Sequence, residues 1–212
     1  MRPPHIVVFD LGKVLLDFDY GIVAPRIAAH SRVSAPEVKR LLNQSPLLHR
    51  FETGLMTKQQ FYEEVSSATG FQGDIEVFSE MFGDIFTPIP PMIELHAAVR
   101  TLGVPVYIFS NTNELAIGHI RRHHPFFAGF DGYVFSYEHG AMKPDAKLYE
   151  VLERVTNRRG AEIFYLDDRA ENVEAAAARG WRAVLHETPA KSRATLEAAG
   201  LLGQTLPAGP PP

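Results

Sequence analysis

Four groups of polar residues stand close to the ends of apolar segments that are far apart in the chain. Asp10 follows an apolar run that begins at His5, and the other groups are Ser110-Asn111, Lys143-Pro144 and Asp167-Asp168. A carboxylate, a hydroxyl with an amide, an ammonium group and a carboxylate pair are chemically complementary. Because ligand sites in parallel sheets form at the carboxyl ends of strands, this placement predicts an enzyme site.

Asp10 is the candidate nucleophile. A carboxylate can attack phosphorus and form an aspartyl-phosphate, which divides one difficult displacement into two easier ones. A carboxylate at a strand end can also cap the turn that follows it. Asp10 taken alone leaves both interpretations open.

The next two groups suit the binding of a phosphoryl group. Ser110 and Asn111 offer a hydroxyl, an amide and neighbouring main-chain N–H groups, which can hold phosphate oxygens without adding charge. The same residue types are ordinary in turns and helix caps. Lys143 supplies a compact positive charge for a phosphate dianion, although most lysines are solvated surface residues.

Asp167 and Asp168 form the fourth group, at the end of the apolar segment 163–166. Adjacent carboxylates repel each other unless a cation or a lysine compensates their charge. A donor set of oxygen atoms alone, with no cysteine, favours Mg²⁺ over zinc. The alternative is an Asx turn that caps the next helix.

The elements that must position these groups follow from the pattern of apolar residues. Five short apolar segments are typical of buried parallel strands, and between the later ones lie three helical patterns. This alternation predicts a Rossmann-like, doubly wound α/β fold. The predicted strands are 5–10, 105–110, 132–136, 162–167 and 182–186, and the predicted helices are 113–122, 145–155 and 172–179.

A helical segment interrupts this alternation after the first strand. Residues 34–37 and 57–60 have the form of capping boxes, and Phe78, Phe82 and Phe86 recur at helical spacing. We therefore expect a catalytic core over 1–17 and 89–202 and an inserted all-helical cap over 18–88. Residues 203–212 contain four of the chain's 16 prolines and are predicted to be a disordered tail.

Composition narrows the classes of function. The net charge of −4 over 212 residues gives no electrostatic footprint for nucleic acid. No apolar run is long enough to span a bilayer, a signal peptide is not expected, and without cysteine there is neither a disulfide nor a thiolate nucleophile. We expect a cytoplasmic protein that binds neither nucleic acid nor membrane, and its oligomeric state is not encoded in any recognisable pattern.

Together the four groups resemble the motifs of the haloacid dehalogenase-like (HAD) superfamily. The matching segments are Phe9–Val14, Phe109–Thr112, Met142–Pro144 and Tyr165–Asp168. The resemblance covers the chain except its tail, and it implies a C1-type helical cap. The details are most similar to small bacterial sugar-phosphate phosphatases of the α-glucose-1-phosphate phosphatase type, so it implies a Mg²⁺-dependent phosphomonoester hydrolase with a small phosphorylated substrate.

The resemblance also implies a role for each matching residue. Asp10 becomes the nucleophile and, with the main-chain carbonyl of Gly12 and the carboxylate of Asp168, a metal ligand. Ser110 and Asn111 bind the transferring phosphoryl group. Lys143 neutralises the charge of that group and orients Asp10 and Asp167. Asn172 supports the Asp168 loop.

One departure from the family pattern is Gly12, where HAD phosphatases have an aspartate that acts as general acid and base. That help is worth about 10² to 10⁴ in rate. An easily departing leaving group, a water molecule or another side chain would have to compensate, and His49, Glu52 and Lys13 are candidates. Alternatives are an L-2-haloacid dehalogenase, or a weakened HAD-fold module that binds a ligand or a protein. A mutase is disfavoured because it relies on the missing acid.

A second candidate cluster is His119, His123 and His124, two of which are spaced i, i+4. No neighbouring glutamate completes a zinc-protease pattern. We interpret these residues as an exposed helix end and assign them no function.

Overall fold

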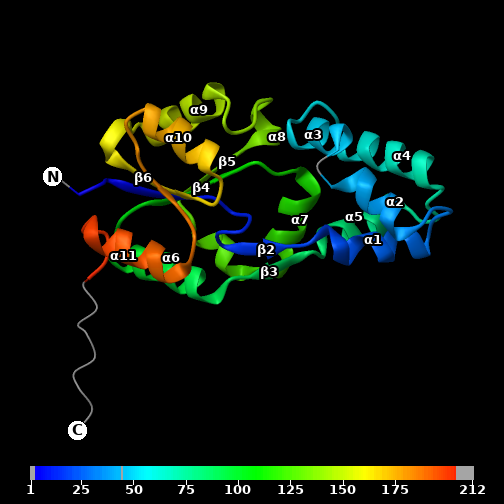
Figure 1. Ribbon diagram of the computed structural model, residues 1–212, viewed down its shortest axis with the longest axis horizontal. Helices are drawn as coiled ribbons and strands as arrows, with labels where there is room; N and C mark the ends of the chain where they lie inside the picture. Colours follow the sequence, from blue (N-terminus) through cyan, green and yellow to red (C-terminus); the bar gives the residue numbers. More distant parts are fainter. Residues whose placement is uncertain (1–2, 44, 204–212) are drawn as a thin grey trace, which may run out of the picture.

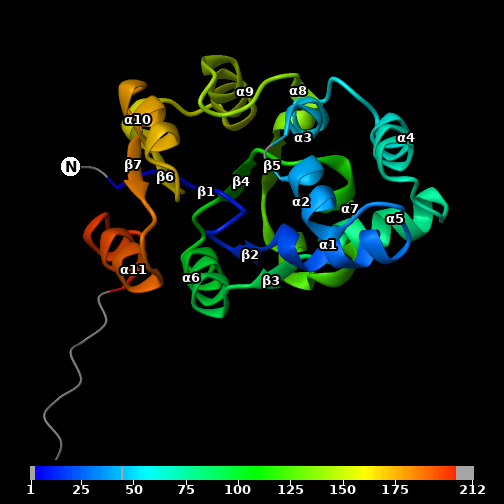
Figure 2. The same ribbon diagram turned by 45° about the vertical axis from the view of Figure 1, so that its right-hand side comes forward.

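Five parallel strands form the central sheet in the order β5-β4-β1-β6-β7 (Figure 2). The computed structural model describes residues 3–43 and 45–203. Each strand lies within one of the predicted ranges, so the predicted doubly wound core is confirmed. The strands are β1 (Ile6–Phe9), β4 (Val106–Ser110), β5 (Gly132–Phe135), β6 (Ile163–Asp167) and β7 (Arg182–Leu185).

Burial on both faces explains why these segments are apolar throughout. In β1, Val7 and Phe9 belong to one hydrophobic cluster and Ile6 and Val8 to another, because successive side chains of a strand point to opposite faces. Figure 1 shows α9 and α10 on one side of the sheet and α6 and α11 on the other. The core helices are α6 (Pro90–Thr101), α7 (Glu114–His123), α8 (Ser136–His139), α9 (Ala146–Thr156), α10 (Ala170–Ala178) and α11 (Pro189–Ala198).

The three helices predicted for the core are confirmed as α7, α9 and α10. The third begins at Ala170, two residues before the predicted start, and places Asn172 in its first turn. Gly180 has the left-handed conformation expected after this helix, with φ of 81°. Single turns of 3-10 helix, η1 (Pro125–Gly129) and η2 (Gly160–Glu162), precede β5 and β6.

A helical cap is inserted between two short strands and extends to the right of the sheet in Figure 1. The strands β2 (Leu16–Phe18) and β3 (Phe86–Pro88) pair antiparallel and were not predicted, because three residues are too few to show a period. The cap helices are α1 (Tyr20–Ala29), α2 (Ala35–Leu42), α3 (Pro46–Glu52), α4 (Lys58–Thr69) and α5 (Ile75–Gly83).

The cap has a hydrophobic cluster of its own, which includes Phe61, Phe78 and Phe82. The predicted capping box at Thr57 is confirmed, since Thr57 and Gln60 exchange side-chain hydrogen bonds with each other's main-chain N–H groups. Phe86 differs from the prediction, because it lies on β3 and not on a helix. The boundaries 18–88 of the cap and those of the core stay a prediction.

The remaining expectations concern the chain end and the membrane. Within 3–43 and 45–203, no helix is long and apolar enough to cross a bilayer. Of the predicted disordered tail, residues 204–212 lie outside the described residues.

Candidate active site

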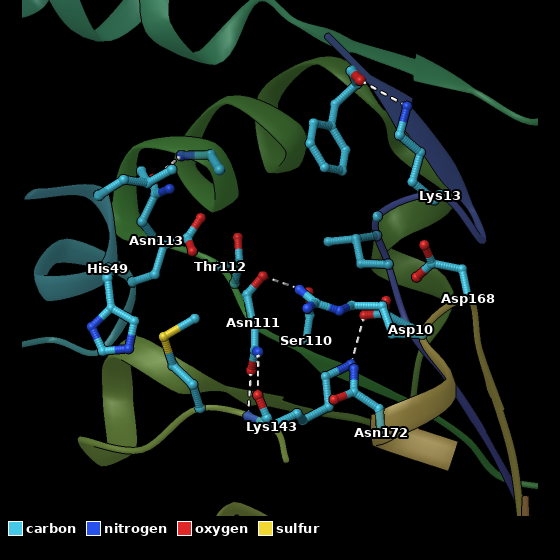
Figure 3. Close-up of a pocket in the computed structure, with 18 of the residues that line it drawn as sticks. Asp10, Lys13, His49, Ser110, Asn111, Thr112, Asn113, Lys143, Asp168 and Asn172 are labelled. Atoms are coloured by element: carbon cyan, nitrogen blue, oxygen red, sulfur yellow. Dashed lines mark hydrogen bonds and ion pairs between the residues drawn. The ribbon is translucent and has the colours of Figure 1, made fainter. Parts of the chain in front are cut away.

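One pocket of about 660 Å³ opens beside the carboxyl ends of the strands. It brings together most of the residues singled out from the sequence (Figure 3). Cap residues from α1, α3 and the α2–α3 connection form the opposite wall. The predicted site residues that line the pocket are Asp10, Gly12, Ser110, Asn111, Lys143, Asp168 and Asn172.

Lys143 lies at the centre of the buried charges. Its Nζ atom is 2.9 Å from Oδ1 of Asp10 and 2.7 Å from Oδ2 of Asp167. It also donates a hydrogen bond to the main-chain carbonyl of Phe109, at 2.8 Å. One ammonium group therefore fixes both carboxylates, the geometry expected of a lysine that orients Asp10 and Asp167.

Asp167 is enclosed by donors and does not line the pocket. It accepts hydrogen bonds from the Tyr165 hydroxyl, from Nδ2 of Asn172 at 3.0 and 3.1 Å, and from the main-chain N–H of Arg169 at 2.8 Å. Asn172 thus holds the carboxylate of Asp167, the residue directly before Asp168, and its support of the Asp168 loop stays a prediction. Asn172 lies in the first turn of α10, directly after the loop that follows β6.

The surroundings of the three carboxylates shift their pKa values in different directions. Burial raises the pKa of Asp10, and the charges of Asp167 and Asp168 raise it further against the opposing effect of Lys143. Burial also acts on Asp167, but the charge and hydrogen bond of Lys143 outweigh it and lower the pKa of Asp167. Burial and the neighbouring Asp167 raise the pKa of Asp168. The site carries more negative charge than Lys143 balances.

The donor atoms fit a hard divalent cation. Carboxylate oxygens of Asp10, Asp167 and Asp168 lie within 4.8 Å of one another. Asp167 has its oxygens occupied by the donors described above. Asp10 and Asp168 line the pocket together with Gly12, and carboxylate and main-chain oxygens of this kind suit Mg²⁺.

The side chain of Asn111 bonds to the main chain of Lys143, whereas the sequence predicts that Asn111 binds the phosphoryl group. Its Oδ1 accepts a hydrogen bond from the main-chain N–H of Lys143 at 2.7 Å, and its Nδ2 donates to the Lys143 carbonyl at 2.9 Å. This amide joins two loops and is not free to hold a phosphate oxygen. Any contact from Asn111 to a phosphoryl group must come from its main-chain N–H, beside the hydroxyl of Ser110.

Glu52 and Asn113 line the pocket although they lie outside the motifs, and Ser136 contacts Glu52. Glu52, at the end of α3, is half-buried and hydrogen-bonds with the Asn113 side chain. Its main-chain carbonyl accepts a hydrogen bond from Oγ of Ser136 at 2.5 Å. Ser136 carried no signal in the sequence, and Asn113 could be recognised only as a helix cap.

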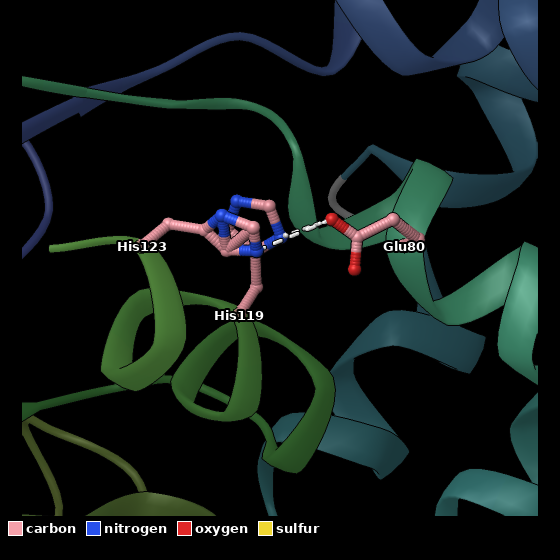
Figure 4. Close-up of side chains that lie close together, drawn as sticks. All are labelled: Glu80, His119 and His123. Carbon is pink, nitrogen blue, oxygen red and sulfur yellow. Dashed lines mark ion pairs between the residues drawn. The ribbon is translucent and has the colours of Figure 1, made fainter.

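The histidine cluster lies outside the pocket. Figure 4 shows Glu80 of α5 pointing toward His119 and His123 of α7, at 3.5 and 3.3 Å. The other carboxylate oxygen of Glu80 is 3.0 Å from Arg122. These contacts join the cap to the core, and Arg122 balances the charge of Glu80.

Comparison with known proteins agrees with this arrangement. The family model described as haloacid dehalogenase-like hydrolase matches residues 4–180. The sesquiterpene phosphatase astK of Aspergillus oryzae is 28% identical over 174 residues, which are 82% of this chain and 85% of that protein.

Solved structures share the fold at low sequence identity. A HAD family enzyme from Bacteroides thetaiotaomicron superposes with a TM-score of 0.77 at 18% identity, covering 88% of this chain and 95% of that one. The same enzyme has been solved with magnesium and inorganic phosphate. The L-2-haloacid dehalogenase of Xanthobacter autotrophicus gives a TM-score of 0.62 at 17% identity, over 84% and 75% of the two chains. Since the family model spans most of the chain, this protein is an enzyme that belongs to the haloacid dehalogenase-like hydrolases.

Proposed function

We propose that this hydrolase is a Mg²⁺-dependent phosphomonoester phosphatase that forms an aspartyl-phosphate on Asp10. The observation that carries the proposal is the buried ammonium group of Lys143 between Asp10 and Asp167 at the floor of the pocket. Lys143 holds one oxygen of Asp10 in place and contributes positive charge where a phosphoryl group would bind. The phosphatase activity of the astK relative supports the same class of reaction.

Each residue around Asp10 would have a separate role in phosphoryl transfer. Ser110 and the main chain at Asn111 would bind the equatorial oxygens, and Lys143 would offset their charge. Asp10, Asp168 and the carbonyl of Gly12 would hold Mg²⁺, which supplies further positive charge to the transferring group when it is bound. Asp167 and Asn172 would keep Lys143 in position.

The substrate is a small phosphorylated metabolite, for which the sequence motifs suggest a sugar phosphate. A second candidate is the phosphate ester of an apolar alcohol. The pocket lining supports it, because the apolar residues Phe18, Tyr20, Leu48 and Phe86, which come from the cap and from the strands that lead to it, line the pocket, and the relative astK is a sesquiterpene phosphatase. Such a wall can exclude water and contact hydrocarbon, whereas a sugar needs polar partners.

A dehalogenase is the less suitable alternative. It would use a carboxylate such as Asp10 to attack carbon and would need no metal. The cluster of carboxylate oxygens on Asp10, Asp167 and Asp168 suits a divalent cation that this reaction does not require. The likeness to the Xanthobacter dehalogenase concerns the fold.

Release of inorganic phosphate from a panel of sugar phosphates and terpenoid phosphates tests the proposal, with Mg²⁺ and with EDTA. We expect Mg²⁺-dependent release by the parent protein, and its loss in Asp10→Asn. Asp74→Asn is the matched control, since Asp74 caps α5 in the cap and asparagine is also a good helix cap. No release from any substrate, or full activity in Asp10→Asn, would refute the phosphatase. Chloride release from 2-chloropropionate would support the dehalogenase instead.

A further inference from the structure

Geometry sets the side on which the leaving group must be protonated. In phosphoryl transfer the attacking and leaving oxygens are roughly in line with phosphorus. Asp10 attacks from the carboxyl end of β1, on the core side of the pocket. The leaving oxygen therefore departs toward the opposite wall, which is formed by the cap.

Residue 12 cannot supply the proton. A Cβ atom at Gly12 would lie 2.8 Å from Cε1 of Phe18, which is closer than side-chain carbon atoms approach. The ring of Phe18 occupies the space that an acidic side chain at residue 12 would enter. The proton donor has to come from another part of the pocket.

Only one carboxyl group of the cap lines the pocket in the part of the chain that the structure describes, and it belongs to Glu52. The other two candidates from the sequence are less suitable. Lys13 pairs with Asp17 and donates to the carbonyl of Phe18 at 2.9 Å. His49 lies on an exposed part of α3.

Two core contacts hold Glu52 against the site. Ser136, directly after β5, donates to the main-chain carbonyl of Glu52 and also accepts the N–H of Thr112, at 2.9 Å. Gly54 then passes so close to the core that a Cβ atom there would be 2.0 Å from the Tyr137 carbonyl oxygen. The end of α3 is therefore tied to the same loop that carries Ser110.

The surroundings of Glu52 favour its neutral form near neutral pH. Burial raises the pKa of Glu52 to about 7, against the opposing effects of its hydrogen bond with Asn113 and of the charge of Arg169. The group facing it from α1 is Tyr20, whose pKa lies well above its usual range because of burial and the charge of Glu52. A carboxyl group of this pKa can both give and take a proton at neutral pH.

We propose that Glu52 is the general acid and base that replaces the aspartate missing at residue 12; the proposal rests on the proposed phosphatase function. In the first step an Asp10 oxygen bonds to phosphorus, the ester P–O bond breaks, and the leaving oxygen takes the carboxyl proton of Glu52 and departs as an alcohol. In the second step the Glu52 carboxylate takes a proton from water while that water's oxygen bonds to phosphorus. The bond from phosphorus to Asp10 breaks, which returns phosphate, the Asp10 carboxylate and protonated Glu52.

The test compares two leaving groups in Glu52→Gln. An alkyl phosphate needs a proton on its leaving oxygen, whereas the phenolate of p-nitrophenyl phosphate is stable without one. We expect kcat on the alkyl phosphate to fall by about 10² or more. With p-nitrophenyl phosphate the variant should give a burst of one equivalent of nitrophenol per enzyme and then a slow rate, because Asp10 is still phosphorylated but water is no longer activated.

Further measurements separate this role from a structural one. Single-turnover phosphorylation by the parent protein should slow as the pH rises through about 7, and Glu52→Gln should lose that dependence. Glu52→Asp, which keeps a carboxyl group, should recover part of the activity. Glu63→Gln, on the exposed face of α4, is the matched control. Thermal melting checks the folding of each variant.

The outcomes distinguish this proposal from the phosphatase proposal. A parent protein that hydrolyses no phosphate ester refutes the phosphatase, and the role of Glu52 with it. An active parent, together with a Glu52→Gln variant that shows unchanged alkyl-phosphate kcat and no burst, refutes the role of Glu52 alone. If Glu52→Gln does not fold, single-turnover phosphorylation by the parent protein that does not slow as the pH rises through about 7 refutes it equally.

Discussion

The ring of Phe18 stands where a side chain at residue 12 would have to lie, 2.8 Å from the position of a Cβ atom on Gly12. Phe18 belongs to β2, whose pairing with β3 forms the connection between core and cap. The glycine that departs from the family pattern therefore packs directly against an aromatic residue of the strand that leads into the cap.

The first prediction concerns this pair. Gly12→Ala should lower the free energy of unfolding, because the new methyl group forces the ring of Phe18 from its position. Phe18→Leu should suppress that effect, with a coupling energy between the two substitutions of about 1–2 kcal/mol. Denaturant unfolding of the parent, both single variants and the double variant measures it.

The control for the first prediction is Gly118→Ala in α7. A Cβ atom there has its nearest neighbour at 3.7 Å, on Arg122. This variant should be neutral or slightly more stable, because alanine is the better helix former. Additive effects of Gly12→Ala and Phe18→Leu would contradict the proposed steric link.

The second prediction concerns the buried lysine. Lys143→Met should abolish activity and lower stability by about 3–5 kcal/mol, because it leaves Asp10 and Asp167 buried without their cation. The loss should shrink at low pH. Lys143 lowers the pKa of Asp167 in the folded parent, so protonation of Asp167 at low pH removes the stability that its ionised form contributes. Urea unfolding at neutral and acidic pH gives both values.

Lys191→Met is the matched control for the second prediction. Lys191 forms an exposed pair with Glu187 four residues earlier, and such pairs contribute little. Equal losses of stability in the two variants would argue against a buried charge cluster organised by Lys143.

The third prediction concerns the contact that holds Glu52 over the site. Gly54→Ala should destabilise the protein by about 2 kcal/mol or more and lower kcat, because it combines a φ of 74° with a clash against the carbonyl of Tyr137. Gly103→Ala provides the comparison, since Gly103 has a φ of 72° and no atom near its Cβ position. The difference between the two melting temperatures isolates the contact from the backbone strain. Equal melting temperatures would mean that Gly54 has no close contact with the carbonyl of Tyr137.

Much of the core was predictable because its signals are local. The strand that ends at Asp10 is continuously apolar since both of its faces are buried, and parallel strands necessarily bring their carboxyl ends together. Lys143 and Asp167 therefore converge as the motifs predict. The family and the fold class follow from the same pattern.

The rest depended on tertiary contacts that leave no local trace. Nothing in the sequence shows that the Asn111 amide is taken up by the Lys143 main chain, or that Asn172 reaches Asp167. The strands β2 and β3 are too short to recognise, so the relation between Phe18 and Gly12 was also hidden. The sequence offers Glu52 only as one of three candidates, because its place in the pocket lining and its main-chain contact with Ser136 arise from the fold.

The last prediction tests the environment of Glu52 without any measurement of activity. Burial raises the pKa of this group to about 7 in the folded protein, whereas in the unfolded chain it lies near the ordinary value of 4.5. Between these values the folded state binds more protons than the unfolded state, so the contribution of Glu52 to stability falls as the pH rises from about 4.5 to 7. Glu52→Gln cannot lose a proton, and its stability relative to the parent should rise over that range by on the order of 2 kcal/mol.

Chemical denaturation of both proteins from pH 4.5 to 8 gives this difference, and Glu63→Gln should leave the parent's pH dependence unchanged. Parallel curves for the parent and Glu52→Gln would show that Glu52 is ionised throughout, and a group in that state could not donate the proton to the leaving oxygen.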